Sequence, residues 1–172
     1  RIVVCSFYLD GSKAMAQHVL NLRAVVNYAN NNNLPFLLTG DSNCHSPLWG
    51  SGSSDSRGEE LEAFVLEIGA NVENIGEQPT WRNYRSESSI DVTIASANLH
   101  ESILNWRSDF STASDHATIY CELDLNMLKP AAKRKFVDKR KYAEILESKI
   151  KENCPKYLTS ESIHTEAENL NK

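Results

Sequence analysis

A carboxylate and a carboxamide two residues apart are the first side chains in this sequence that could do chemistry. Asp41 and Asn43 lie in LPFLLTGDSNCHSPLWGS, residues 34–51, directly after an apolar run that is typical of a buried strand. In a nearly extended segment both side chains leave the backbone on the same side and can meet at one bound atom. A carboxylate can orient water or protonate a leaving oxygen, and an amide can donate to a phosphoryl group. The pair suits phosphate chemistry, with a capped loop as the structural alternative.

Two further segments place polar side chains where a strand meets a loop. SSIDVTIAS, residues 88–96, alternates apolar and polar residues, and this alternation turns Asp91 toward a polar face. SDH, residues 114–116, ends a polar loop before another strand. Taken alone, Asp91 could be a surface residue, and Asp115 with His116 could cap the following segment. Together with the carboxylate and amide described above, they would complete a set of groups able to handle a phosphate.

The elements expected to position these residues alternate between strands and helices. Apolar residues at three- and four-residue spacing predict two helices, the first of them capped by Ser12. Residues 2–9 are apolar on both faces, which favours a strand in the centre of a sheet. Besides the strand that ends at Asp41, we expect strands at residues 2–9, 72–75, 80–81, 89–95, 103–106 and 117–125, and helices at residues 12–30 and 59–68. This order favours a mixed sheet layered with helices over a doubly wound parallel fold.

Length and composition indicate an ordinary globular chain. Its 172 residues can form one domain with a substantial core, and 41% hydrophobic with 24% charged residues is usual for such a domain. No apolar run reaches the roughly 18 residues that a membrane helix needs, so no membrane contact is expected. The four cysteines are scattered, which favours reduced thiols in an intracellular setting over a disulfide framework or a zinc site.

Charge divides the chain into two parts. Residues 1–128 carry 7 basic and 16 acidic side chains, whereas residues 129–172 carry 11 basic and 7 acidic ones. We therefore expect a folded body at 1–128, followed by a basic linker and a helical tail at 129–172. An acidic body is a poor non-specific binder of nucleic acid. Any contact with DNA would depend on local arginine and lysine or on a metal that offsets the carboxylates.

Four short motifs, in order along the chain, carry a resemblance to a known family. They are GDSNCHSPLWGS at residues 40–51, TW at 80–81, SSIDVTIAS at 88–96 and SDH at 114–116. Over about residues 2–125 the chain resembles the endonuclease/exonuclease/phosphatase family. Within it, the chain looks most like the apurinic-type endonuclease domains of non-LTR retrotransposons, in which GDFNAHHPLWGS, TW, SSIDLT and SDH occur in this order. Ser42 stands where phenylalanine is commoner, which concerns packing more than chemistry.

The resemblance implies both a fold and a reaction. The implied fold is a four-layered α/β sandwich with mixed sheets, and the implied reaction is hydrolysis of phosphate esters with a divalent metal, usually magnesium. By that resemblance, Asp41 would align the attacking water or handle the leaving oxygen, and Asn43 would hydrogen-bond the phosphate. His116 would contact the scissile phosphate, while Asp91 would orient the imidazole. Tyr8, at the end of the first strand, would also hydrogen-bond the phosphate.

The metal site implied by the resemblance is incomplete in this sequence. Asp115 would lie beside the metal, but the family's metal-binding glutamate and a phosphate-contacting asparagine lie on strands that precede the tyrosine strand. This chain opens at Arg1, immediately before that strand. We therefore expect that the N-terminal part of the sandwich is missing and that the chain by itself is inactive or nearly so.

DNA is the substrate that the resemblance implies. RNYRSE, residues 82–87, lies between two strand motifs and is expected to form a hairpin tip whose Arg82 and Arg85 contact a DNA groove. An exposed polar turn is the structural alternative. Family architecture further implies a reverse transcriptase domain beyond residues 129–172, a nick that primes the copying of RNA into DNA, and the nucleus as the site of action.

Two other functions stay open. The chain could be a phosphoesterase that acts on small molecules or lipids with the same catalytic set. It could also be a non-catalytic remnant of a truncated transposon. Several further residues are expected to be structural: His45 and His100 as ordinary polar positions, Trp49 and Trp81 as packing within the sandwich, and Cys44 as a small buried hydrophobe.

Overall fold

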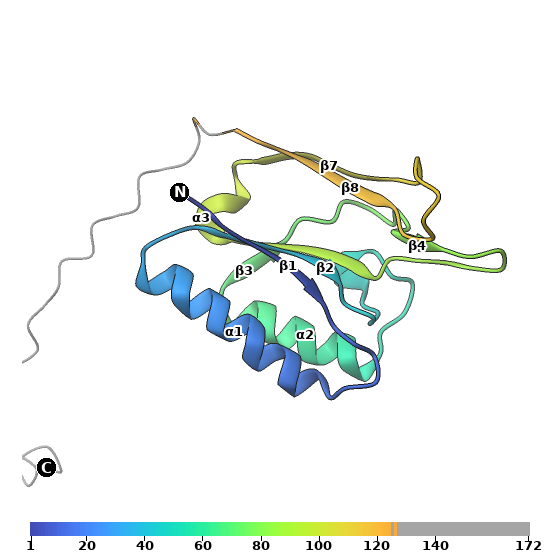
Figure 1. Cartoon of the computed structure of the whole chain (residues 1–172), viewed down its shortest axis with the longest axis horizontal. Coiled ribbons are helices and arrows are strands. Elements are labelled where there is room, and N and C mark those ends of the chain that lie inside the picture. The colour runs from blue at the N-terminus through green and yellow to red at the C-terminus, as the bar shows by residue number, and fades with distance from the viewer. Residues whose placement is uncertain (125, 127–172) are drawn as a thin grey trace, which may run out of the picture. The chain divides into compact units, whose positions relative to one another are not determined.

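A four-stranded mixed sheet lies at the centre of the described structure (Figure 1). The computed structural model describes residues 1–124 and 126, so the linker and tail predicted at 129–172 lie outside the described residues. The strand order is β1 (Val3–Tyr8), β2 (Phe36–Asp41), β6 (Asp91–Ser96) and β3 (Ala70–Val72). β1 and β2 run parallel, whereas β6 is antiparallel to both β2 and β3. The prediction of a mixed sheet is confirmed.

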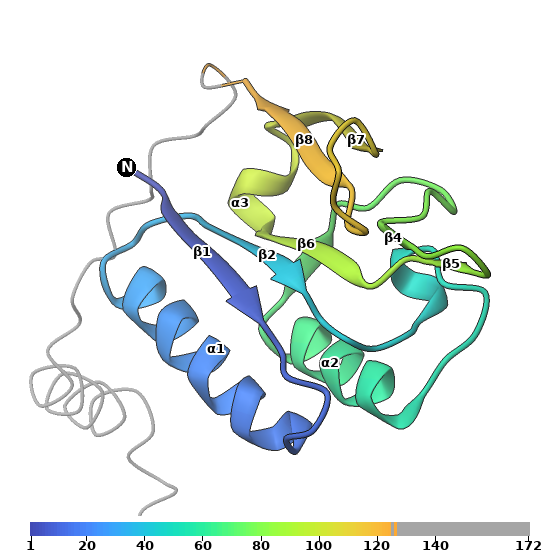
Figure 2. The ribbon, with the colours of Figure 1, turned by 45° about the vertical axis from the view of Figure 1, so that its right-hand side comes forward.

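Two amphipathic helices cover one face of this sheet (Figure 2). α1 (Met15–Asn31) connects β1 to β2, and α2 (Ser56–Glu67) precedes β3. Their apolar stripes face the sheet, and removing this apolar surface from water stabilises the layer. The buried residues between helices and sheet are Leu9, Met15, Leu22, Val26, Ala29, Phe36, Leu38, Cys44, Trp49, Leu61, Phe64, Val65, Val92 and Ile94. Cys44 and Trp49 are therefore core residues, as expected.

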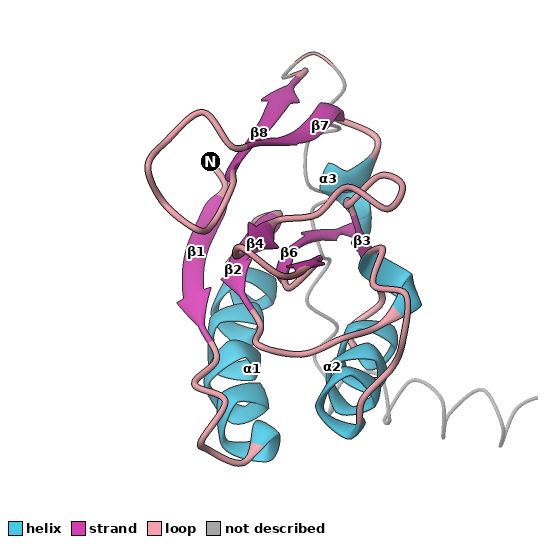
Figure 3. Ribbon diagram, turned by 90° about the vertical axis from the view of Figure 1, so that its right-hand side faces the viewer, coloured by secondary structure: helices cyan, strands magenta, loops and turns pink. Residues whose placement is uncertain are grey.

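An antiparallel hairpin, β7 (Ile103–Asp109) with β8 (Thr118–Leu123), lies on the other side of the sheet (Figure 3). Trp106 anchors this hairpin to the sheet, because its indole Nε1 donates to Thr93 Oγ1 on β6 at 3.0 Å. Helices, sheet and hairpin thus form the layers of a mixed α/β fold. A one-turn helix, α3 (Ala97–His100), joins β6 to β7.

A smaller hairpin and a short helical turn complete the end of the molecule that carries the polar motifs. β4 (Trp81–Arg82) and β5 (Glu87–Ser88) pair in antiparallel fashion, as the sequence between the TW and SSIDVT motifs predicts. The turn η1 (Pro47–Trp49) follows β2 and is capped by Ser46, whose hydroxyl accepts from the backbone N–H of Leu48. Both elements border the loop that leaves β2.

Two details of the sequence prediction are wrong. β1 lies at the edge of the described sheet rather than in its centre, and its side chains alternate between the core and solvent, with Val4 65% exposed. Ser12 does not cap α1, which begins at Met15. Its hydroxyl instead donates to Asp10 Oδ1 at 2.7 Å within the preceding loop. The asparagine run does end α1 as expected, and Asn33 adopts the left-handed conformation with φ 52°.

Candidate active site

Three strands bring polar side chains to one edge of the central sheet. Asp41 is the last residue of β2 and Asp91 is the first of β6, and the two are direct neighbours in the antiparallel ladder. Tyr8, the last residue of β1, is the neighbour of Asp41 in the parallel ladder. Because residues in register project to the same face of a sheet, these three side chains share one face at one edge.

Asn43 meets Asp41 through a turn rather than through an extended segment. The backbone N–H of Asn43 donates to Asp41 Oδ1 at 2.8 Å, and its side-chain Nδ2 donates to Asp41 Oδ2 at 3.1 Å. Asn43 itself has a left-handed φ of 47°, which asparagine tolerates better than most residues. The predicted convergence of the two side chains therefore occurs, but the extended geometry proposed for it is wrong.

His116 joins this group from the segment before β8. Its Nδ1 lies 2.9 Å from Asp91 Oδ2, and its Nε2 lies 3.9 Å from Asp41 Oδ2. Since an ionised carboxylate only accepts hydrogen bonds, Nδ1 carries a proton toward Asp91. The structure thus brings Asp41, Asn43, Asp91 and His116 together. Their catalytic roles stay predictions.

The surroundings shift the proton affinities of this group. Burial raises the pKa of Asp41, and the charge of Asp91 adds to this effect, although the N–H of Asn43 opposes it. Burial alone would lower the pKa of His116, but its hydrogen bond to Asp91 and the negative charges around it raise the pKa above the ordinary value. Perturbed proton affinities of this kind mark Asp41 and His116 as candidates for proton transfer.

The substitution Asp91→Asn tests this electrostatic description. It is expected to lower the pKa of His116, because asparagine can still accept from Nδ1 but carries no charge. The titration of the His116 ring proton, followed by NMR in the unmodified chain and in the variant, measures the shift. The raised pKa also means that His116 stabilises the fold at acid pH and loses this contribution as the pH rises through its folded-state pKa. An unchanged His116 titration would contradict the assignment.

Asp115 and Tyr8 lie beside the group without joining its hydrogen bonds. Asp115 Oδ2 accepts from the indole Nε1 of Trp81 at 3.0 Å, and this hydrogen bond helps to hold the pKa of Asp115 below its usual value. Tyr8 is 67% exposed, and its hydroxyl makes no hydrogen bond to any other described residue. The sequence predicts that Trp81 packs within the sandwich. In the structure its indole instead orients Asp115 at the surface.

The two arginines of the small hairpin are stacked on aromatic rings. The guanidinium carbon of Arg82 lies 4.1 Å from the centre of the Phe110 ring, and that of Arg85 lies 4.7 Å from the Tyr84 ring. Both arginines are exposed, and Tyr84 is 85% exposed at the hairpin tip. Stacking holds each guanidinium in place while leaving its N–H groups free for an outside partner.

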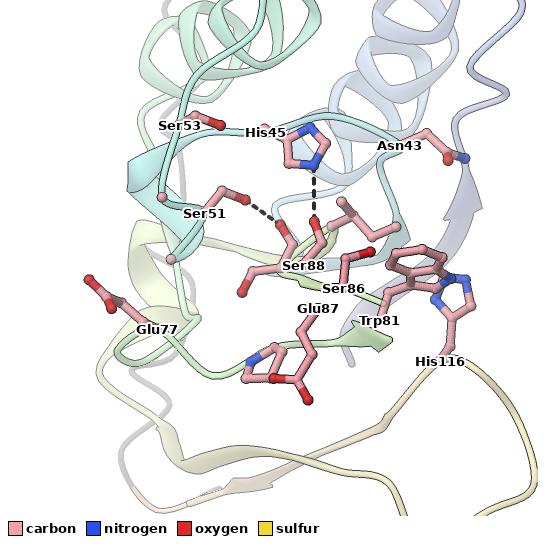
Figure 4. A pocket seen from close by; sticks show the side chains of 15 residues that line it. Asn43, His45, Ser51, Ser53, Glu77, Trp81, Ser86, Glu87, Ser88 and His116 are labelled. Carbon is pink, nitrogen blue, oxygen red and sulfur yellow. Dashed lines mark hydrogen bonds between the residues drawn. The ribbon is translucent and has the colours of Figure 1, made fainter. Parts of the chain in front are cut away.

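A pocket of about 680 Å³ opens between these elements (Figure 4). Asn43 and His116 form part of its wall, and so do Trp81 and a group of serines from the loop after β2 and from the small hairpin. His45 also lines it, held between Asp55 and Ser88, so the sequence prediction of an ordinary polar position missed this placement. The high serine content of residues 42–56 and 86–89 is the one signal that could have indicated a polar cavity.

Comparison with solved structures defines the class of fold. The endonuclease domain of TRAS1, a telomere-specific non-LTR retrotransposon, matches with a TM-score of 0.63 and 27% sequence identity over 70% of this chain and 55% of that domain. A 3'-5' exonuclease from Neisseria meningitidis matches with a TM-score of 0.57 and 20% sequence identity, over 70% of this chain and 60% of the exonuclease. An AP endonuclease from Archaeoglobus fulgidus matches with a TM-score of 0.54 and 16% sequence identity, over 72% of this chain and 62% of that endonuclease. The fold is that of the nuclease and phosphatase hydrolases.

The family follows from a match along most of the sequence. The family model described as Endonuclease-reverse transcriptase matches residues 2–120, which include the four motifs and the residues of the candidate site. The chain belongs to this family. It spans between 55% and 62% of the length of the three solved structures described above. None of the curated proteins matches it.

The fold family implies a divalent metal, and the described residues do not by themselves fit one. They contain no group of three histidine, cysteine, aspartate or glutamate side chains arranged to hold a metal ion. Both oxygens of Asp41 already accept from Asn43, and Asp115 accepts from Trp81. A metal bound here would need further ligands. Within the same part of the chain, no helix has the length and apolar character to span a membrane.

Proposed function

We propose that this chain is part of a DNA-nicking endonuclease of a non-LTR retrotransposon, which cuts phosphodiester bonds with a divalent metal, for which we expect magnesium. One observation carries the proposal: His116 lies between Asp91 and Asp41 where β2 ends and β6 begins. The family match and the likeness to the TRAS1 endonuclease domain support the same conclusion.

In the proposed reaction each of the four side chains has one task. Asp91 holds the imidazole of His116 so that Nε2 points at the scissile phosphate and offsets the charge that develops there. The Asn43 amide donates to a phosphate oxygen, and Asp41 positions the attacking water or protonates the leaving oxygen. Tyr8 is proposed to contact the phosphate, and Asp115 is proposed to lie beside the metal. The remaining ligands of that metal come from outside the described residues.

The nicking of supercoiled plasmid tests the proposal. The protein expressed from the whole open reading frame that contains this chain is expected to nick plasmid with magnesium and to stop when the metal is chelated. Residues 1–172 alone are expected to be at least about 100-fold slower, because their site is incomplete. A whole-frame protein that hydrolyses only soluble phosphomonoesters or lipids would contradict the DNA substrate. Robust nicking by residues 1–172 that Asp41→Ala abolishes would contradict the prediction that their site is incomplete.

Arg82 and Arg85 are proposed to contact DNA. Each substitution to alanine is expected to weaken duplex binding and to lower the slope of log K against log salt by about 0.9, the value for one phosphate contact. Fluorescence anisotropy across a salt series measures both effects. Arg23→Ala is the control, because Arg23 is paired with Glu67 on the helical side of the sheet. Slopes equal to that of the unmodified chain would exclude the contact.

The same two arginines are also expected to influence where the nick falls. Arginine in a narrow minor groove reads the shape of the DNA, so the double substitution should change the pattern of cleavage sites more than the rate on generic DNA. Sequencing gels of nicked duplex measure the pattern, and an unchanged ladder would count against this role. We further propose that the reverse transcriptase domain follows residues 129–172 and that the protein acts in the nucleus.

A further inference from the structure

A serine, a histidine and an aspartate are linked in series on the wall of the pocket, apart from the Asp91 and His116 pair. Asp55 Oδ2 lies 2.9 Å from His45 Nδ1, and His45 Nε2 lies 2.9 Å from Ser88 Oγ. His45 comes from the loop after β2 and Ser88 ends β5, and the two side chains face each other in Figure 4. Asp55 directly precedes α2. Three segments distant in the sequence thus place a hydroxyl, an imidazole and a carboxylate in the order used by hydrolytic triads.

The protons in this series are fixed by the carboxylate. Burial would raise the pKa of Asp55, but hydrogen bonds from His45 and from the backbone N–H of Gly58 hold it below its usual value. Asp55 is therefore an acceptor only, so His45 Nδ1 carries the proton. In the neutral imidazole, Nε2 then has a free lone pair and accepts from the Ser88 hydroxyl. The hydroxyl is polarised in the direction that makes its oxygen more nucleophilic.

The backbone around the three groups fixes their geometry. Asp55 caps α2 by accepting from Gly58 N at 2.7 Å, and it also accepts from the backbone N–H of His45 at 3.1 Å. Ser88 is paired with Trp81 in the β4–β5 ladder, and its carbonyl accepts from Thr80 N at 3.0 Å. Neither end of the series can move without breaking a helix cap or a strand pair, which is the condition for a preorganised nucleophile.

We propose that Ser88 is a nucleophile, activated by His45 and Asp55, which reacts with carboxylic esters and with phosphonyl electrophiles that enter the pocket. Ser88 Oγ forms the new bond to carbon or phosphorus, its proton passes to His45 Nε2, and the leaving group departs with the electron pair of the broken bond. The volume of about 680 Å³ admits a small molecule. Glu77 and Glu87 in the wall disfavour anionic reagents, so neutral esters are the preferred class.

Labelling of residues 1–172 with a neutral fluorophosphonate probe tests the proposal. Attack by Ser88 forms the phosphonate ester and releases fluoride, and intact mass with peptide mapping locates the adduct. Ser88→Ala is expected to abolish the adduct, and His45→Gln is expected to slow labelling about 100-fold or more. Asp55→Asn should also slow it while keeping the helix cap, since asparagine caps as well as aspartate.

Ser86→Ala is the matched control, because Ser86 lines the same pocket but its hydroxyl donates to Asn83 rather than to a histidine. It should label at the rate of the unmodified chain. Circular dichroism confirms that each variant is folded before the rates are compared. Two results would overturn the proposal: a folded chain that gives no adduct at Ser88, or an adduct that forms equally fast in the unmodified chain and in His45→Gln.

Discussion

Replacing His116 by alanine is expected to lower the rate of DNA nicking by about 1,000-fold in the protein expressed from the whole reading frame. The imidazole is held by Asp91 at 2.9 Å, and its other nitrogen faces Asp41 across 3.9 Å, where a phosphate oxygen would be bound. Its removal deletes the imidazole that faces both Asp41 and Asp91. The initial rate of plasmid relaxation at saturating DNA measures the loss.

A matched substitution separates this effect from a general loss of folding. His100→Ala removes a histidine that also pairs with a carboxylate, because His100 Nδ1 lies 2.8 Å from Glu73 Oε1. His100 ends α3, beyond the end of β6 opposite Asp91, so nicking should stay within a few-fold of the unmodified rate. Equal losses in the two variants would mean that His116 acts through stability and not through the phosphate.

Replacing Gly40 by alanine is expected to lower the free energy of unfolding by about 3 kcal/mol or more. A Cβ at this position would lie 1.9 Å from the carbonyl oxygen of Phe7, its neighbour in the β1–β2 ladder. Backbone atoms cannot yield as a flexible side chain would, so the two strands would have to separate. The substitution precedes Asp41 directly, and nicking should fall with stability.

Gly52→Ala is the control for this substitution. No heavy atom lies within 4 Å of a Cβ at position 52, so its unfolding free energy should stay within about 0.5 kcal/mol of the original value. Urea denaturation followed by tryptophan fluorescence compares the two variants. A Gly40→Ala chain as stable as Gly52→Ala would show that the close approach of β1 and β2 is not a tight constraint.

The residues of the candidate site could be found from the sequence because each sits where an apolar strand meets a polar loop. The strand patterns around Asp41 and Asp91 are regular, and antiparallel pairing of their strands makes the two aspartates neighbours. The turn at Asn43 could not be found in this way. Its left-handed backbone depends on hydrogen bonds to the carboxylate of Asp41, which a pattern of apolar residues does not report.

Tertiary contacts decided the features that the sequence did not indicate. Residues 2–9 are apolar enough for a central strand, but sheet order follows from pairing between distant segments, and β1 lies at the edge of the described sheet. His45 gave no signal of its own, because its partners Asp55 and Ser88 lie 10 and 43 residues away in the sequence. Trp81 likewise gave no signal of its own, because its partner Asp115 lies 34 residues away in the sequence.

The comparison of Asp41→Ala, His116→Ala and the double variant in plasmid nicking by the whole-frame protein tests the central claim most directly. If the two side chains act on one phosphate, each single substitution should be severe, and the double variant should be little slower than the slower single one, because residues that act as a unit give non-additive losses. A double variant whose loss equals the product of the two single losses would contradict the claim, because the two side chains would then act independently.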